Sequence, residues 1–175
     1  MTLARRYHAT LAGVAATYLP SRAAAAVVVQ DTWLGMLSGL DDYDGRVPFR
    51  SWLFEILVHR ARSAGDGGRR PVPAAGYTAG PGRFRADGSW VLLPLPWPED
   101  AGERLCAPAA RPAIRAAIDA LPPGPRRVVL LRDVAGLPGR EVSELLAISD
   151  ASQRALLHHG RSRIRQALEQ QVREG

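Results

Sequence analysis

A long stretch rich in glycine and proline divides this chain. Residues 64–108 contain eight glycines and seven prolines, the two residue types that most strongly interrupt helices and central strands. Connections within a compact domain seldom exceed about 15 residues. We therefore expect two separate folded units, at residues 1–66 and 111–175, joined by an irregular linker at 67–110.

The first unit has the apolar spacing of helices. A first helix is expected near residues 3–18. A second follows Ser21, a common N-cap residue type, and a third begins at Pro48, which suits the first turn of a helix. A polar loop at residues 41–46 separates the second helix from the third. The side chains expected to pack from these two helices are Val29, Trp33, Met36, Leu37, Phe49, Leu53, Ile56 and Leu57.

The second unit is expected to contain shorter helices, at residues 114–121, 126–134, 140–146 and 150–172. The last two flank a three-residue turn, Ala147-Ile148-Ser149, and Ser149 is a good N-cap. This is the spacing of a helix-turn-helix, in which the N-terminal end of the second helix enters the major groove of DNA.

Two faces run side by side along the last expected helix. The positions expected to face the core recur about once per turn and are Gln153, Leu157, Gly160 and Ile164. The neighbouring stripe is basic and consists of Arg154, His158, Arg161 and Arg165. Arginine can read guanine or bind phosphate. A helical hairpin with merely solvated arginines would give the same pattern, so this motif alone leaves both interpretations open.

Charge favours an anionic partner without identifying it. The net charge is +6, and residues 111–175 hold eleven arginines against seven acids. Such a balance suits nucleic acid or a membrane surface. However, all 23 basic residues are arginine, which suggests biased codon usage. A solvated surface explains the charge equally well.

Several classes of protein find no support in the sequence. The lone Cys106 cannot form an internal disulfide, and no Cys and His cluster has zinc spacing. No nucleophile elbow or phosphate loop is present, so we expect no catalytic residue, metal or cofactor. The N-terminus lacks the apolar core of a signal peptide, and no run of about 18 apolar residues suggests a membrane span. We expect a cytoplasmic protein without membrane insertion.

Three stretches closely resemble parts of extracytoplasmic-function (ECF) RNA polymerase sigma factors. Residues 120–137 read ALPPGPRRVVLLRDVAGL and are similar to the start of sigma region 4. Residues 28–34 read VVQDTWL and resemble the region 2 helix that docks on the polymerase clamp. Residues 48–62 read PFRSWLFEILVHRAR and resemble the helix that reads and opens the −10 promoter element. They occur in the family's order on both sides of the linker, which makes the resemblance far more specific than any one motif.

The resemblance implies an all-α fold with a region 2-like three-helix domain and a region 4-like helix-turn-helix domain. It implies an alternative sigma factor, not an enzyme, with core RNA polymerase, promoter DNA and an anti-sigma protein as partners. Residues expected at the −35 element are Ser152, Arg154, Ala155, His158, His159, Arg161 and Arg165. Those expected at the −10 element are Tyr43, Arg50, Trp52, His59, Arg60 and Arg62. Those expected at the polymerase are Gln30, Asp31 and Leu34.

Aromatic and cationic groups suit the −10 role, because melted bases stack on such side chains. Trp52, like its neighbour Phe49, is also a candidate core residue at helical spacing. Gln30 and Asp31 would equally fit an ordinary solvated helix face.

The chain also departs from the family pattern. Ala26-Val27 stands where many members carry an acidic pair, His59 stands at a position that is often asparagine, and residues 158–161 read HHGR in place of a typical HRAR. Two other interpretations therefore stay open. One is a helix-turn-helix regulator that acts without polymerase. The other is a degenerate sigma-like protein that only sequesters a partner.

Overall fold

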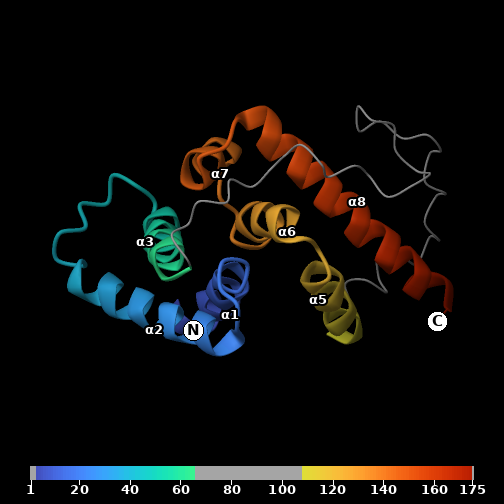
Figure 1. Cartoon of the computed structure of the whole chain (residues 1–175), viewed down its shortest axis with the longest axis horizontal. Coiled ribbons are helices and arrows are strands. Elements are labelled where there is room, and N and C mark those ends of the chain that lie inside the picture. Colours follow the sequence, from blue (N-terminus) through green and yellow to red (C-terminus); the bar gives the residue numbers. More distant parts are fainter. Residues whose placement is uncertain (1–2, 66–107, 175) are drawn as a thin grey trace.

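The structure, a computed structural model, describes residues 3–65 and 108–174 (Figure 1). Every regular element in those two ranges is a helix, which confirms the expected all-α class for the described part of the chain. The expected linker lies outside the described residues except at its end, where Pro108–Ala110 forms the short 3-10 helix η2.

The first unit contains α1 (Leu3–Ala15), α2 (Arg22–Ser38) and α3 (Phe49–Ala64). Ser21 is the N-cap of α2, because its Oγ accepts a hydrogen bond of 3.1 Å from the Ala24 N–H. Pro48 is the N-cap of α3, so the helix begins at Phe49, one residue later than expected. The three expected helices are therefore present.

The end of α1 comes earlier than expected, at Ala15 instead of near residue 18. Tight turn bonds replace the helical pattern, since the Thr17 N–H and its Oγ1 both donate to the Val14 carbonyl, at 3.0 and 2.7 Å. The Thr17 carbonyl is thereby left at a helix end, where carbonyl oxygens lack helical partners.

The helices of the first unit enclose an apolar core in which Leu53 and Leu57 are completely buried. One core expectation is wrong, because Leu37 is 60% exposed. Val29 and Met36 share the buried side of α2, whereas Leu37 lies about 80° further round the helix than Val29, at about 100° per residue. The remaining expected positions, Trp33, Phe49 and Ile56, are half-buried against the same core.

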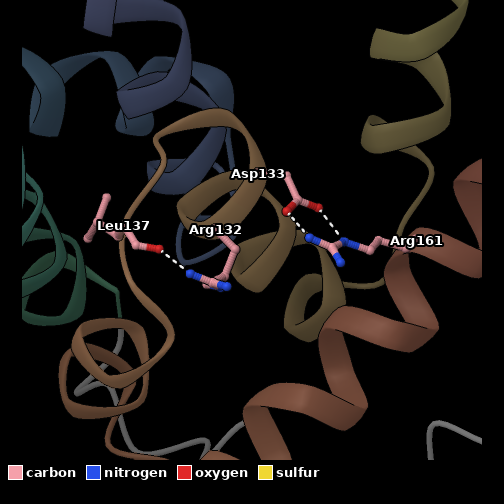
Figure 2. A network of polar contacts seen from close by, with 4 residues as sticks. All are labelled: Arg132, Asp133, Leu137 and Arg161. Carbon is pink, nitrogen blue, oxygen red and sulfur yellow. Dashed lines mark hydrogen bonds and ion pairs between the residues drawn. The ribbon is translucent and has the colours of Figure 1, made fainter.

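The second unit contains α5 (Arg111–Asp119), α6 (Pro123–Val129), η3 (Leu130–Val134), α7 (Gly139–Leu146) and α8 (Asp150–Glu174). The single helix expected at 126–134 is interrupted, because α6 continues into a π-helical turn, η3. There the Ala135 N–H donates to the Leu130 carbonyl at 2.8 Å, five residues back instead of four. Arg132 then donates to the Leu137 carbonyl at 2.6 Å and holds the following loop (Figure 2).

The helix-turn-helix has the expected turn. Ala147 adopts the left-handed conformation, with φ of 53°, and its N–H bonds to the Glu144 carbonyl at 3.1 Å. The chain thus leaves α7 abruptly. Ser149 Oγ accepts the Ser152 N–H at 3.1 Å and caps α8, as expected.

Gly160 lets α8 approach α6 closely, as the sequence predicts. A Cβ atom built at Gly160 would lie 2.6 Å from Val129 Cγ2 and 3.5 Å from the Pro125 carbonyl oxygen. Leu157 and Gln153, one and two turns earlier, are also buried. The predicted core face of α8 is therefore confirmed along its first half.

The two units pack directly against each other (Figure 1). Helix α1 contacts η3, and α3 contacts α7. A Cβ at Gly13 would lie 3.3 Å from Leu130 Cδ1, and buried residues from both units form one continuous apolar cluster. This arrangement of the units is a finding that the sequence did not supply.

Candidate nucleic-acid and polymerase interface

The N-terminal half of α8 presents an exposed face. Arg154, Ala155 and His158 are all exposed there, at the end of the helix that would enter a major groove. Ser152 is half-buried, and its hydroxyl lies 2.9 Å from that of Ser149 in the cap. This exposed face therefore combines the cationic side chain of Arg154 with the shorter side chains of Ala155 and His158.

Three other residues expected at the −35 element are buried or form ion pairs within the protein. His159 is 6% exposed, and burial lowers its pKa, with nearby Arg163 and His158 adding to the effect. Arg165 is half-buried and bonds to Glu169 at 3.0 Å. Arg161 bonds to Asp133 (Figure 2). The spacing of Arg161 and Arg165 predicts a shared stripe with Arg154, but both side chains form ion pairs within the protein.

The contact between Arg161 and Asp133 is bidentate. The Arg161 Nε donates to Oδ2 at 2.9 Å and its Nη2 donates to Oδ1 at 2.6 Å. The hydrogen bond to Asp133 raises the pKa of Arg161 above its ordinary value, so the guanidinium stays charged. Sequence reasoning missed Asp133 as a partner because the two residues are 28 positions apart.

An aromatic cluster holds the loop before α3. The rings of Tyr43 and Trp52 are stacked, with centroids 4.7 Å apart and an interplanar angle of 24°, and Phe49 packs edge-on to Tyr43 at 6.1 Å. The Tyr43 hydroxyl also donates to the Val47 carbonyl at 2.5 Å. The structure thus brings together two aromatic residues expected at the −10 element and places Phe49 against both of them.

A groove of about 580 Å³ runs along α3 and gathers most of the remaining −10 candidates. Its lining includes Trp52, His59, Arg60 and Arg62 from α3, and Glu144 and Leu145 from α7. Gly35 of α2 makes room for Arg60, since a Cβ at Gly35 would lie 2.2 Å from the Arg60 Nη2. A glycine inside an expected helix was the available signal for this close approach.

The start of α3 meets the second unit. Ser51 is 7% exposed, and its hydroxyl donates to the Glu141 carboxylate at 2.5 Å. Arg50 is half-buried and approaches Gly136, where a Cβ would lie 3.2 Å from its Nη1. Sequence reasoning missed Ser51, Glu141 and Gly136, because nothing local links residues from different units.

The outer face of α2 carries large apolar side chains in the open. Leu34 is 62% exposed, Leu37 60% and Val27 56%. Gln30 is exposed between them, and Asp31 is half-buried. Leu37 and Val27 extend the predicted polymerase contact of Gln30, Asp31 and Leu34. Contiguous exposed apolar side chains commonly mark an interaction surface.

The described residues offer neither a metal site nor a membrane span. In residues 3–65 and 108–174 no group of three or more His, Cys, Asp or Glu side chains is placed to hold a metal ion. None of the helices there is both long and apolar enough to cross a membrane.

Models of two sigma-70 regions match this chain in the order of its two units. Sigma-70 region 2 matches residues 3–65 and sigma-70 region 4 matches residues 111–164. The chain belongs to the sigma-70 family. ECF RNA polymerase sigma factor SigG from two strains of Mycobacterium tuberculosis is 30% identical over 152 residues. The match spans 78% of this chain and 40% of the length of SigG.

Two solved structures share the fold. The structure of RpoE with the anti-sigma factor NepR from Bartonella quintana has a TM-score of 0.56 at 15% identity and covers 94% of both chains. CnrH in complex with the cytosolic domain of CnrY has a TM-score of 0.50 at 24% identity, covering 96% of this chain and 86% of the other. The sigma regions coincide with the folded units, α1–α3 and α5–α8.

Proposed function

We propose that this chain is an alternative sigma factor that binds core RNA polymerase and directs initiation at specific promoters. The observation that carries the proposal is the paired match, region 2 on α1–α3 and region 4 on α5–α8. A regulator that acts without polymerase needs a helix-turn-helix but has no use for a region 2 unit. The sigma family is not a family of enzymes, and we assign no catalytic step to this chain.

In this proposal the exposed face of α2 docks on the polymerase clamp. Leu34 and Leu37 supply the apolar contact, and Gln30 and Asp31 supply polar ones. Because exposed carboxylates are absent at Ala26-Val27, the docking depends more on apolar burial than on charge. Its affinity should therefore change little with salt concentration.

The DNA contacts are divided between the units. The N-terminal half of α8 reads the −35 element as duplex, with Arg154 and His158 near base edges or phosphates. The groove of α3 binds the −10 element, where His59, Arg60 and Arg62 meet phosphates or bases. The Tyr43–Trp52 stack supports the loop beside it, and an aromatic surface there suits unstacked bases.

We also propose a protein that masks the free factor, and a cytoplasmic location where polymerase is found. Of the two solved structures with the same fold, one is a complex with the anti-sigma factor NepR and the other is a complex with the cytosolic domain of CnrY. A partner of this chain would have to cover either the α2 face or the α3 groove to compete with polymerase or promoter.

Run-off transcription with core polymerase and a promoter library tests the proposed function. We expect specific start sites that share paired −35 and −10 elements and that require the protein. Leu34→Glu should abolish them, whereas Arg115→Ala, a change of an exposed residue on α5, should not. Duplex binding without transcripts would contradict the proposal. That outcome would favour a sigma-like protein that only sequesters a partner, to which the Ala26-Val27 departure points.

A further inference from the structure

We propose that Gly35 of α2 is a positioning residue for −10 recognition. The missing side chain of Gly35 leaves a notch in α2, and this notch holds the Arg60 guanidinium in the α3 groove, where it binds a phosphate of the melted −10 strand. The inference rests on the proposed sigma function and names the residue that sets the geometry of its −10 site.

The Arg60 guanidinium lies against the backbone of α2 at Gly35. A Cβ atom built at Gly35 would lie 2.2 Å from Arg60 Nη2, 2.9 Å from its Cζ and 3.1 Å from its Nε. Any other residue at position 35 would therefore fill the space that the guanidinium occupies. Both residues are half-buried and both line the groove of about 580 Å³. The place of Arg60 in the groove thus depends on the missing side chain.

The backbone at position 35 does not itself require glycine. Gly35 lies inside α2, four residues before the C-cap Gly39, and the glycines with positive φ in the described part of the chain are Gly45 and Gly136. A glycine in a helix interior lowers stability relative to alanine, because it loses more backbone entropy on folding. The contact that this cost accompanies is the one with Arg60.

The surroundings of Arg60 favour a cation but leave its donors available. Gly35 opens the last turn of α2, where the partial negative charge of the helix end favours a cation. The guanidinium makes no hydrogen bond or ion pair with any residue in 3–65 or 108–174. A half-buried charge without such a partner is poorly compensated for its lost water. Its five N–H donors can therefore bind an anion that enters the groove.

Other half-buried arginines of this protein have engaged donors. Arg132 donates to the Leu137 carbonyl at 2.6 Å, and Arg126 forms an ion pair with Asp119. These contacts hold one part of the second unit to another. Arg60 instead is held by its fit against Gly35, which fixes its position without engaging the guanidinium, as a binding residue requires.

A second glycine of α2 contacts the aromatic part of the same groove. A Cβ at Gly39 would lie 3.3 Å from Trp52 Cζ2, and Trp52 lines the groove together with Arg60. The two α3 residues are eight positions apart, or about 12 Å along the helix at about 1.5 Å per residue. A ring and a cation placed in this way suit a single strand, whose bases stack while its phosphates meet positive charge.

Phenylglyoxal, which modifies arginine guanidinium groups, tests the notch in the whole free protein. Tandem mass spectrometry of the peptide that contains Arg60 follows its rate of modification. Gly35→Ala should raise this rate severalfold, because the added Cβ displaces the guanidinium from α2. Ser38→Ala, at an exposed position of the same helix, also favours the helix and should leave the rate unchanged. An unchanged rate in Gly35→Ala would overturn the notch.

Urea unfolding separates positioning from packing. Gly35→Ala should have a midpoint equal to or above that of the unmodified protein, since alanine favours the helix and the displaced group is the flexible end of an arginine. A lower midpoint would show that Gly35 serves the packing of the first unit, and it would contradict the proposed role.

The DNA contact is tested with holoenzyme and a promoter fragment that is already melted at the −10 element, taken from a start site found by run-off transcription. Fluorescence anisotropy measures the affinity at several salt concentrations. Gly35→Ala and Arg60→Ala should each weaken binding about tenfold, the usual effect of losing one arginine contact. Each should also reduce the slope of log affinity against log salt by about 0.7, the value for one phosphate on a single strand.

The double variant should bind no more weakly than Arg60→Ala alone, because both changes remove the same contact. Additive losses, or a Gly35→Ala variant that binds as well as the unmodified protein, would overturn the inference. Affinity for core polymerase should be unchanged; its loss in Gly35→Ala would place Gly35 in the docking face of α2 instead. If the unmodified protein itself fails to bind core polymerase or the fragment, the proposed function is wrong, whereas the phenylglyoxal rates do not depend on it.

Discussion

Arg161 and Asp133 form a bidentate ion pair between α8 and η3 (Figure 2). The Arg161 Nε lies 2.9 Å from Asp133 Oδ2, and its Nη2 lies 2.6 Å from Oδ1. The sequence places Arg161 on the same stripe as Arg154, where both are candidates for DNA contacts. In the structure, the carboxylate of Asp133 already satisfies two donors of Arg161. The pair fixes the approach of α8 to η3, and thereby the orientation of the helix that carries Arg154.

Arg161→Ala should lower the free energy of unfolding by about 0.5–1 kcal/mol, because the pair is bidentate but still partly exposed. Urea unfolding of the whole protein measures this change. Asp133→Asn should have a similar effect, and the double variant should be no worse than either one. Arg163→Ala, a change of an exposed neighbour on the same helix, serves as the control. Equal losses for Arg161→Ala and Arg163→Ala would show that the pair does not stabilise the unit.

Arg154→Ala should weaken binding to −35 duplex about tenfold or more, since one arginine contact to a base contributes about 1–3 kcal/mol. It should leave the urea midpoint unchanged, because the side chain is exposed. Gel-shift titration at fixed salt measures the affinity, with Arg115→Ala as the matched control. If both variants bind equally well, α8 does not read DNA through Arg154.

Gly160→Ala should destabilise the protein by about 1–3 kcal/mol, the usual cost of overpacking a filled core. The new Cβ would lie 2.6 Å from Val129 Cγ2. This cost opposes the gain of about 1 kcal/mol that alanine normally brings to a helix interior. Adding Val129→Ala should relieve the clash and recover part of the loss in urea unfolding. A stabilised Gly160→Ala variant would mean that α8 and α6 are further apart than described.

Acidification should destabilise the protein in part through His159. Burial lowers its pKa, so the unfolded chain binds a proton at a higher pH than the folded protein does. The contribution of neutral His159 to the free energy of unfolding is therefore fully present above the ordinary pKa of 6.5. It is lost as the pH falls toward the lowered pKa of the folded protein.

Urea midpoints measured between about pH 5 and pH 8, the range in which histidine titrates, should fall toward the acid side. His159→Gln should flatten this dependence, although it also removes a buried ring. His8→Gln, at an exposed position in α1, should keep the slope. The same slope in both variants would show that His159 is not the group responsible.

Leu34→Glu and Leu37→Glu should each weaken binding of core polymerase by at least tenfold, because each places a charge in an apolar contact that must lose its water. Folding should be unaffected, since both side chains are more than half exposed. Pull-down or fluorescence anisotropy with core polymerase measures the effect. Leu3→Glu, also an exposed leucine, is the control, and equal binding by all three variants would exclude this face of α2.

Local signals in the sequence predicted local structure well. Ser21 and Ser149 cap α2 and α8 as their residue types suggest, and the turn at residues 147–149 is where the spacing puts it. These features depend on neighbours within a few positions, which is the range over which backbone capping and turn formation act. Leu37 shows that such local prediction can fail even within one helix. Apolar residues occur on several sides of α2, so the sequence did not determine which side is buried.

The sequence by itself determined the class of the fold, the two helical units, the helix-turn-helix and the family. Tertiary structure decided which of its arginines are exposed and how the units meet. Arg161 reaches Asp133 across 28 positions, Ser51 reaches Glu141 across 90, and Arg127 reaches Thr17 across 110. The physical reason is that periodicity reports which side of a helix is polar. It does not report which carboxylate, carbonyl or ring another part of the chain brings to that side.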